Sequence, residues 1–488
     1  ITVSLKGTTI GAMTDATGHY FLKNLPEGDF ILQVSAVGYK AQSRKVTLKR
    51  GKTLEENFEL EEDLIALDGV VVTANRSETT RRMAPTLVNV MDFKLFENTN
   101  SATLSQGLNF QPGVRVETNC QNCGFQQVRI NGLDGPYTQI LIDSRPIFSA
   151  LAGVYGLEQI PANMIERVEV MRGGGSALFG SSAIAGTINI ITKEPLRNSG
   201  QLSHTITGVG GTSSWDNSTT MNASLVTDNS KAGLYIFGQN RERSGYDSDG
   251  DGFTELPKLK NQTVGFRSFL KTSAYSKLTF EYHHLQEFRR GGDLLNRPPH
   301  EANIAEQLRH SINSGGLKFD YFSPDEKHRL SVYASAQHIG RDSYYGGNQD
   351  LNAYGATKDF TWVAGSQYIY HFDRCLFMPS DLTGGVEYNQ DNLKDDMWGY
   401  NRYTNQKVRI AGAFFQNEWR NRQWSILLGG RLDKHNLINH VIFSPRANIR
   451  FNPVENVNLR ASYSVGFRAP QAFDEDLHIE NVGGTISM

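Results

Sequence analysis

The residues best suited to chemistry are four carboxylates within one glycine-rich stretch, namely Asp247, Asp249, Asp251 and Glu255. Alternating carboxylates followed by a glycine, here Gly252, form a ligand pattern that suits a hard cation such as Ca²⁺. Lys258 stands where an EF-hand carries its bidentate glutamate, so the stretch is not an EF-hand. Two interpretations stay open: a loop ordered by calcium, which we favour, and a flexible acidic loop without an ion.

A second group is a pair of cysteines. The chain has 3 cysteines, of which Cys120 and Cys123 form a C-x-x-C pair and Cys375 stands alone. This spacing is found in redox sites, in half-sites for zinc and in small disulfide loops. In the sequence, no second cysteine pair or neighbouring histidine cluster supports zinc, and no thioredoxin-like context supports redox chemistry.

Three histidines are candidate ligands for a haem iron: His283, His284 and His478. Imidazole is a common axial ligand of haem. A single histidine on a polar loop is more often solvated, and we favour that interpretation. No nucleophile, base and acid stand in a catalytic pattern, so the sequence does not indicate an enzyme.

Composition limits the elements that can position these residues. The 488 residues carry 49 Lys and Arg against 51 Asp and Glu, which gives no electrostatic case for nucleic acid. With no run of 18 apolar residues and a mean hydropathy of −0.42, the chain is not a helical membrane protein. A transmembrane β-barrel stays possible, because its strands alternate and average out as polar. Because the chain begins at Ile1 and ends soon after Gly484, we expect truncation at both ends.

The sequence divides into four regions. Residues 1–60 alternate short β-runs with turn residues, as in a small β-sandwich. Residues 61–76 form an acidic linker followed by a short β-branched strand that has no obvious folding partner, so we expect it to hang freely. Residues 77–197 mix helix and strand signals, and residues 198–488 alternate apolar and polar residues over about 13 strands. Long polar connectors between such strands fit lipid on one face and a lumen on the other.

The last strand illustrates the alternation. Leu459, Tyr463 and Phe467 fall on one face, which we predict to contact lipid. Arg460 and Ser462 fall on the other face, which we predict to point inward.

The first region resembles the carboxypeptidase regulatory-like domain, a non-catalytic module. The segment that carries the resemblance is TDATGHYFLKNLPEGDFILQVSAVGYK.

Residues 68–488 resemble TonB-dependent outer-membrane receptors. The resemblance rests on DGVVVTANR, VRINGLDGPYTQILIDSRPI and IERVEVMRGGGSALFGSSAIAGTINIITKEP, and in the last region on FSPRANIRFNP and SYSVGFRAPQAFDEDLH. It implies a mostly β protein: a 22-stranded antiparallel barrel in the outer membrane, of which residues 198–488 hold the first part. It also implies an internal α/β plug at 77–197 and an N-terminal domain in the periplasm.

The resemblance also assigns functional residues. It implies a TonB box at Asp68, Gly69, Val70, Val71, Val72 and Thr73, an extended segment that adds as a strand to the partner TonB. In the oxidising cell envelope, we predict that Cys120 and Cys123 form a disulfide that tightens a plug loop. That loop would face the substrate, with Gln121, Asn122, Phe125 and His478 as binding residues.

The implied function is import of a scarce, large nutrient, without catalysis. The VVVTANR segment and an acidic loop early in the barrel favour cobalamin, and the FRAPQAFDEDLH segment is equally typical of haem receptors. We place cobalamin slightly before haem; the alternative is a ferric siderophore, and a passive porin or a surface adhesin is less favoured. Expected partners are TonB, outer-membrane lipid and a surface lipoprotein lid, and Ca²⁺ is the expected cofactor of the acidic loop.

Overall fold

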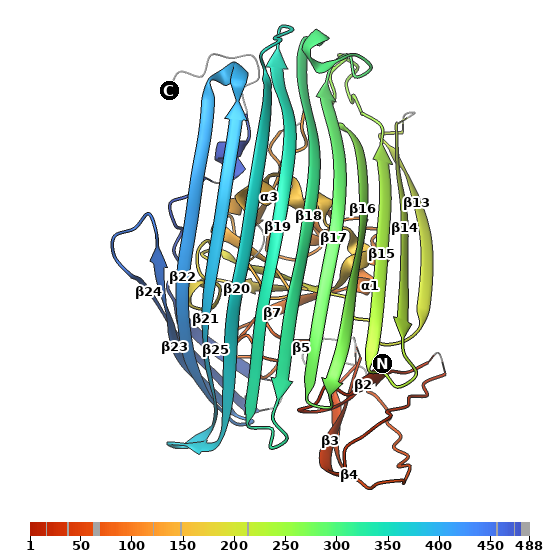
Figure 1. Cartoon of the computed structure of the whole chain (residues 1–488), viewed down its shortest axis with the longest axis vertical. Helices are drawn as coiled ribbons and strands as arrows, with labels where there is room; N and C mark the ends of the chain where they lie inside the picture. Colours follow the sequence, from red (N-terminus) through yellow and green to blue (C-terminus); the bar gives the residue numbers. More distant parts are fainter. Residues whose placement is uncertain are drawn as a thin grey trace.

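The computed structural model describes residues 1–488 except 16, 37–38, 62–68, 121, 147–148, 212–213, 455–456, 473 and 480–488. One tall, curved sheet wraps around a smaller α/β domain, and a third small domain lies at one end of the sheet, beside the N-terminus (Figure 1). Among the described residues, no helix has the length and apolar character needed to cross a membrane.

As far as the structure describes the chain, the large sheet has 13 strands, each hydrogen-bonded in antiparallel fashion to the next in sequence. They are β13 (Ser199–Val209), β14 (Ser214–Val226), β15 (Ala232–Arg243), β16 (Lys258–Ser273), β17 (Ser276–Gly292), β18 (Ile304–Phe322), β19 (His328–Gly347), β20 (Tyr354–Cys375), β21 (Met378–Met397), β22 (Arg402–Arg420), β23 (Trp424–His435), β24 (Ile442–Val454) and β25 (Val457–Ser464). The predicted number of strands is confirmed.

The two ends of this sheet differ in their connections. Two-residue to five-residue turns join β16 to β17 and β18 to β19 at the end that carries the N-terminal domain, where Thr9 donates to the carbonyl of Ala274. The opposite end carries the longer connections, including 244–257 and 293–303. Outer-membrane barrels have short periplasmic turns and long extracellular loops. The longer connections therefore mark the extracellular end.

Strand β25 confirms most of the predicted facing. Leu459 and Tyr463 are 56% and 62% exposed on the outer face, whereas the Arg460 guanidinium donates to plug carbonyls, including that of Ala84. The prediction for Phe467 is wrong, because β25 ends at Ser464. Beyond that point the backbone of Phe467 bonds to the plug, at the hydroxyl of Ser176.

The plug inside the barrel is built on a four-stranded sheet of order β10-β12-β11-β7. Its strands are β7 (Val88–Asp92), β10 (Thr138–Ile142), β11 (Ile165–Arg172) and β12 (Gly186–Thr192), and a separate hairpin joins β8 (Val114–Thr118) to β9 (Gln126–Ile130). Its helices are α1 (Phe93–Asn98), α2 (Leu104–Leu108), η1 (Gly135–Tyr137), α3 (Ala150–Gln159), η2 (Ala162–Met164) and α4 (Ser176–Phe179). Buried aliphatic side chains such as Ile188 and Val168 fill its core.

The N-terminal domain is a four-stranded antiparallel sheet of order β2-β1-β3-β4. Its strands are β1 (Thr2–Leu5), β2 (Gly11–Met13), β3 (Gly28–Ser35) and β4 (Gln42–Leu48). Val3, Val34 and Val46 alternate with half-buried or exposed neighbours and form its small core. The other elements are β5 (Val70–Val71), β6 (Thr79–Thr80), η3 (Pro299–Glu301), η4 (Trp398–Tyr400) and α5 (Asp474–Leu477).

Candidate functional site

The segment predicted to hang freely as an extended strand is instead docked into the plug. Strand β5 pairs with β6, and Val71 is 0% exposed in a cluster with Leu178 and Phe179. The expectation that this segment lacks a folding partner is therefore wrong over Gly69–Thr73, because its valines bury apolar surface in the plug. Asp68 lies outside the described residues.

The buried carboxylate of Glu169 binds the middle of residues 69–76, which we call the docked segment. The Oε2 atom of Glu169 accepts hydrogen bonds from the amides of Val72 and Thr73, each at 2.9 Å, and from the Thr73 hydroxyl at 2.7 Å. Its Oε1 atom accepts from Arg167 at 2.8 Å, and Asn189 donates to the Thr73 hydroxyl at 3.0 Å. Bonds to an ionised, buried acceptor each contribute about 1.5–3 kcal/mol, so Glu169 is the main polar anchor of the segment.

Arg76 ties the docked segment to the barrel wall. Its guanidinium lies 3.1 Å from Glu387 on β21 and donates to the hydroxyl of Tyr333 on β19. The same guanidinium lies 4.6 Å from the ring centroid of Phe414. The docked segment thus contacts both the plug and the wall. A movement of the plug against the wall would therefore alter its contacts.

Buried ion pairs form part of the plug–wall interface. Buried Glu158 at the end of α3 faces the guanidiniums of Arg289, Arg241 and Arg243 at 2.8, 3.1 and 3.0 Å. Burial by itself would raise the pKa of Glu158, but these guanidiniums, Arg289 foremost, hold the pKa down at about 2. Such an interface can rehydrate when it opens, because its groups are also stable in water.

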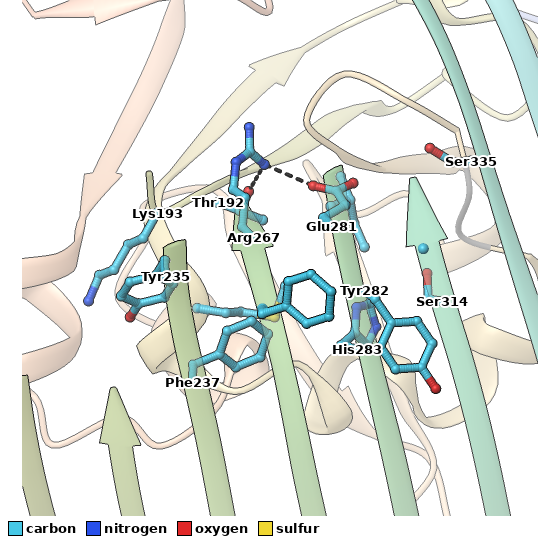
Figure 2. A pocket seen from close by; sticks show the side chains of 14 residues that line it. Thr192, Lys193, Tyr235, Phe237, Arg267, Glu281, Tyr282, His283, Ser314 and Ser335 are labelled. Atoms are coloured by element: carbon cyan, nitrogen blue, oxygen red, sulfur yellow. Dashed lines mark hydrogen bonds and ion pairs between the residues drawn. The ribbon is translucent and has the colours of Figure 1, made fainter. Parts of the chain in front are cut away.

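A small cavity of about 30 Å³ lies between the plug and the wall. Figure 2 shows Arg267 above it, bonded to Thr192 of the plug and to Glu281 of β17, with His283 and Tyr282 on its other side. This volume holds about one water molecule. The cavity is therefore part of the polar interface and is too small for a tetrapyrrole.

The cysteine loop lies at the extracellular end of the plug, and its thiols meet residues from distant parts of the chain. The Cys123 Sγ lies 2.8 Å from His478 Nε2, and the Cys120 Sγ lies 3.3 Å from Glu306 Oε2. None of the three cysteines, all within the described residues, forms a disulfide, so the predicted Cys120–Cys123 disulfide is not found in the structure. A hydrogen bond from Cys123 lowers the pKa of Cys120 to about 4, against the opposing effect of burial.

Two of the predicted substrate-binding residues meet at this loop. The rings of Phe125 and His478 stack at 4.9 Å with an interplanar angle of 19°. Asn122 lies in the same loop against β17, and Gln121 lies outside the described residues. His283 and His284 are on β17 and join no group of potential metal ligands in the part of the chain that the structure describes.

The acidic stretch forms an exposed loop between β15 and β16. Ligand atoms of Asp247, Asp249 and Glu255 lie within 4.8 Å of one another. Asp251 is outside this group, and its carboxylate accepts the amide of Phe253 at 2.8 Å. Both oxygens of Asp247 accept loop amides. The donor set of three carboxylates fits a hard cation, and the calcium site stays a prediction.

Comparison with protein families decides the identity. Residues 195–484, more than half of the chain, match the family described as TonB dependent receptor-like, beta-barrel. The chain belongs to the TonB-dependent receptor family. Residues 80–187 of this receptor match the TonB-dependent receptor plug domain, and residues 1–72 match the CarboxypepD_reg-like domain. The predicted family and accessory domain are confirmed, and the receptor is a β-barrel protein of the outer membrane.

Relatives of the receptor are similar over limited parts of its length. A vitamin B12 transporter of Vibrio vulnificus is 38% identical over 125 residues, which are 26% of this chain and 20% of that one. The vitamin B12 transporter of Vibrio cholerae is 33% identical over 124 residues, 25% of this chain and 20% of its own. The match therefore spans about a fifth of the length of these relatives.

Solved structures show the same fold at low sequence identity. The siderophore receptor PirA of Acinetobacter baumannii superposes with a TM-score of 0.69 at 19% identity, over 80% of this chain and 62% of that one. The ferric enterobactin receptor PfeA of Pseudomonas aeruginosa gives 0.67 at 17% identity, over 80% and 63%. The family is one of receptors, which supports the prediction that the chain is not an enzyme.

Sequence analysis missed three residues of these sites: Glu169, Arg76 and Glu306. Glu169 carried a weak signal, because it stands in the apolar run Val168–Met171, although the same strand also carries Glu166, Arg167 and Arg172. A charge within a buried run indicates a specific partner. Glu306 gave no such signal, since its partners are far away in the sequence.

Proposed function

We propose that this receptor imports a scarce nutrient across the outer membrane, with energy that TonB supplies. The observation that supports it best is the hold of Glu169 on the amides of Val72 and Thr73. Backbone donors that bond to one carboxylate can exchange it for the edge of a partner's strand. Docked and released states of residues 69–76 would then be the resting and coupling states of the receptor.

Substrate binding would shift the balance between these two states. A ligand changes such an equilibrium only by its difference in affinity for the two states. The plug and the wall share the contacts of Arg76 and Glu158, so a ligand that moves the plug apex would strain both. Release of the docked segment would let TonB bind and pull the plug partly open.

The substrate we propose is a tetrapyrrole, cobalamin before haem. The 38% identity with a vitamin B12 transporter supports cobalamin, as does the acidic loop. The alternative is a ferric siderophore, which the solved receptors of similar fold are named for; their identity of 19% and below carries less weight. A passive porin is disfavoured, because the plug fills the lumen with buried ion pairs.

Two further partners belong to this proposal. The long connections 244–257 and 293–303 would meet a surface lipoprotein lid at the extracellular end. Exposed apolar side chains on the outer face, such as Leu459 and Tyr463, would contact outer-membrane lipid.

The test is a binding titration of the purified receptor with cyanocobalamin, haem and ferric siderophores, paired with accumulation in energised cells with and without TonB. We expect saturable binding of cyanocobalamin and accumulation only with TonB. Binding of a ferric siderophore alone would show that the substrate is a siderophore and not a tetrapyrrole. Accumulation without TonB would contradict the coupling mechanism.

A further inference from the structure

Four potential metal ligands converge at the extracellular end of the plug from three distant parts of the chain. Cys120 and Cys123 come from the plug loop after β8, Glu306 from the start of β18, and His478 from the residue after α5. All four ligand atoms lie within 4.8 Å of one another. Cys123, Glu306 and His478 are at most 3% exposed.

We propose that these four side chains bind a thiolate-preferring transition metal ion, with Zn²⁺ as the reference ion. Two cysteines, a histidine and a carboxylate are the donors that tetrahedral zinc accepts, and C-x-x-C is a usual spacing of two of them. Bond lengths near 2.0–2.3 Å put neighbouring ligand atoms of such a site roughly 3.5 Å apart. The contacts of 2.8 and 3.3 Å need only a small expansion to admit the ion.

The protein builds this site rigidly. The φ of Gly124 is +70°, which permits the tight turn in which its amide donates to the Cys120 carbonyl at 3.0 Å. A Cβ at Gly291 of β17 would lie 1.6 Å from the Asn122 carbonyl oxygen, so the wall accepts the loop only with glycine there. Stacking on Phe125 fixes the ring of His478. The ligands are therefore held in place before any ion arrives.

Apolar side chains enclose the donor atoms of the site. The Cys120 Sγ and the Glu306 Oε2 lie 3.3 Å apart beside buried residues such as Leu308 and Tyr345. The His478 Nδ1 has no hydrogen-bond partner among the described residues, so the ring is held through its stacking and through Nε2, the atom that faces Cys123.

The donor set separates this site from the acidic loop. Sulfur and imidazole ligands select zinc-like ions, whereas Ca²⁺ requires oxygen ligands. The site also joins the plug to β18 and to the segment after α5, so a bound ion would fasten the plug apex to the wall. This inference stands independently of the proposed import function, because metal binding by the purified receptor involves neither TonB nor a nutrient.

The test uses the detergent-purified receptor, reduced, stripped of metal and titrated with Co²⁺ as a spectroscopic substitute and then with Zn²⁺. We expect one equivalent of Co²⁺ with thiolate-to-cobalt charge-transfer and tetrahedral d–d bands, which Zn²⁺ abolishes. The double variant Cys120→Ser/Cys123→Ser should lose the charge-transfer band. Glu306→Gln and His478→Asn should each weaken binding at least roughly tenfold, the lower end of what changes around a metal site produce.

The third cysteine provides the matched control. Cys375→Ser should bind Co²⁺ as the parent does, because Cys375 lies at the end of β20, away from the cluster. In the unmodified receptor, Zn²⁺ should protect Cys120 and Cys123, but not Cys375, from alkylation detected by mass spectrometry. This second measurement needs no variant and so does not depend on variant folding.

Several results would overturn the proposal. These are no thiolate-to-cobalt band, a band that survives in the double variant, or alkylation that Zn²⁺ does not slow. Parent-like binding in both Glu306→Gln and His478→Asn would refute the bridge between plug and wall. Formation of a Cys120–Cys123 disulfide in place of metal binding, under the same reducing conditions, would also refute it.

Discussion

Thr73 and Glu169, 96 residues apart, are joined twice: the amide and the hydroxyl of Thr73 both donate to Glu169 Oε2, at 2.9 and 2.7 Å. The carboxylate is fully buried on β11, in the middle of the plug sheet. Any protein that takes hold of the Thr73 backbone must first displace this carboxylate. Release of the docked segment would therefore break this pair.

Glu169→Gln should shift the docked segment toward release. The amide keeps the shape but removes the charge that strengthens three hydrogen bonds. A loss of about 2 kcal/mol corresponds to roughly a thirtyfold change in the equilibrium constant between the docked and released states. The measurement is the rate at which a thiol label reacts with a cysteine at Val70. Glu166→Gln is the control, because Glu166 lies exposed on the same strand; equal labelling in both variants would show that Glu169 does not hold the segment.

Substitutions at Val71 should separate docking from coupling. Val71→Pro removes one amide donor and restricts Val70, so we expect normal surface binding of substrate but no uptake. Val71→Ala keeps the backbone and removes about 1.6 kcal/mol of burial, so it should undock the segment partly while uptake changes little. Binding to whole cells and energised accumulation are measured side by side. Accumulation by the proline variant at the parent's rate would exclude this segment as the coupling strand.

Replacing Asp247, Asp249 and Asp251 by Asn should abolish calcium-dependent substrate binding. Calcium would order the loop before the substrate arrives and so remove an entropic cost of binding. The readout is substrate affinity with calcium and with a chelator. Triple substitution at the partly buried residues Glu326 and Lys327 and the exposed residue Asp373, all at the opposite end, should leave affinity unchanged. Affinity in the parent that does not respond to the chelator would disprove a calcium role.

The seating of α3 against the wall should weaken in acid. The pKa of Glu158 is depressed to about 2 by Arg289 and its neighbours, against burial. A depressed carboxyl pKa adds stability above its unfolded value, near 4.3, and that stability is lost as the pH falls toward about 2. The melting temperature of the purified receptor should fall across this interval. Glu158→Gln should lower it at neutral pH and flatten the acid dependence, whereas exposed Glu97→Gln should change neither.

The sequence alone was sufficient for the fold and the family. Alternation such as that of Leu459, Arg460 and Tyr463 depends on one local rule, that successive side chains of a strand point to opposite faces. The plug segment IERVEVMRGGGSALFG carries its identity in contiguous residues. Both signals depend on residues close together in the sequence, so they can be recognised from the sequence alone.

Only the tertiary structure decided what the functional segments contact. Three consecutive valines predicted an extended backbone, and β5 is indeed a strand. The carboxylate that binds the next residues, Val72 and Thr73, belongs to Glu169, which lies 97 residues beyond Val72. C-x-x-C predicted a local disulfide, whereas His478 lies 355 residues from Cys123. A barrel that wraps around a plug brings together residues that are far apart in the sequence. These contacts form only when the wall packs around the plug, so the local spacing of residues does not predict them.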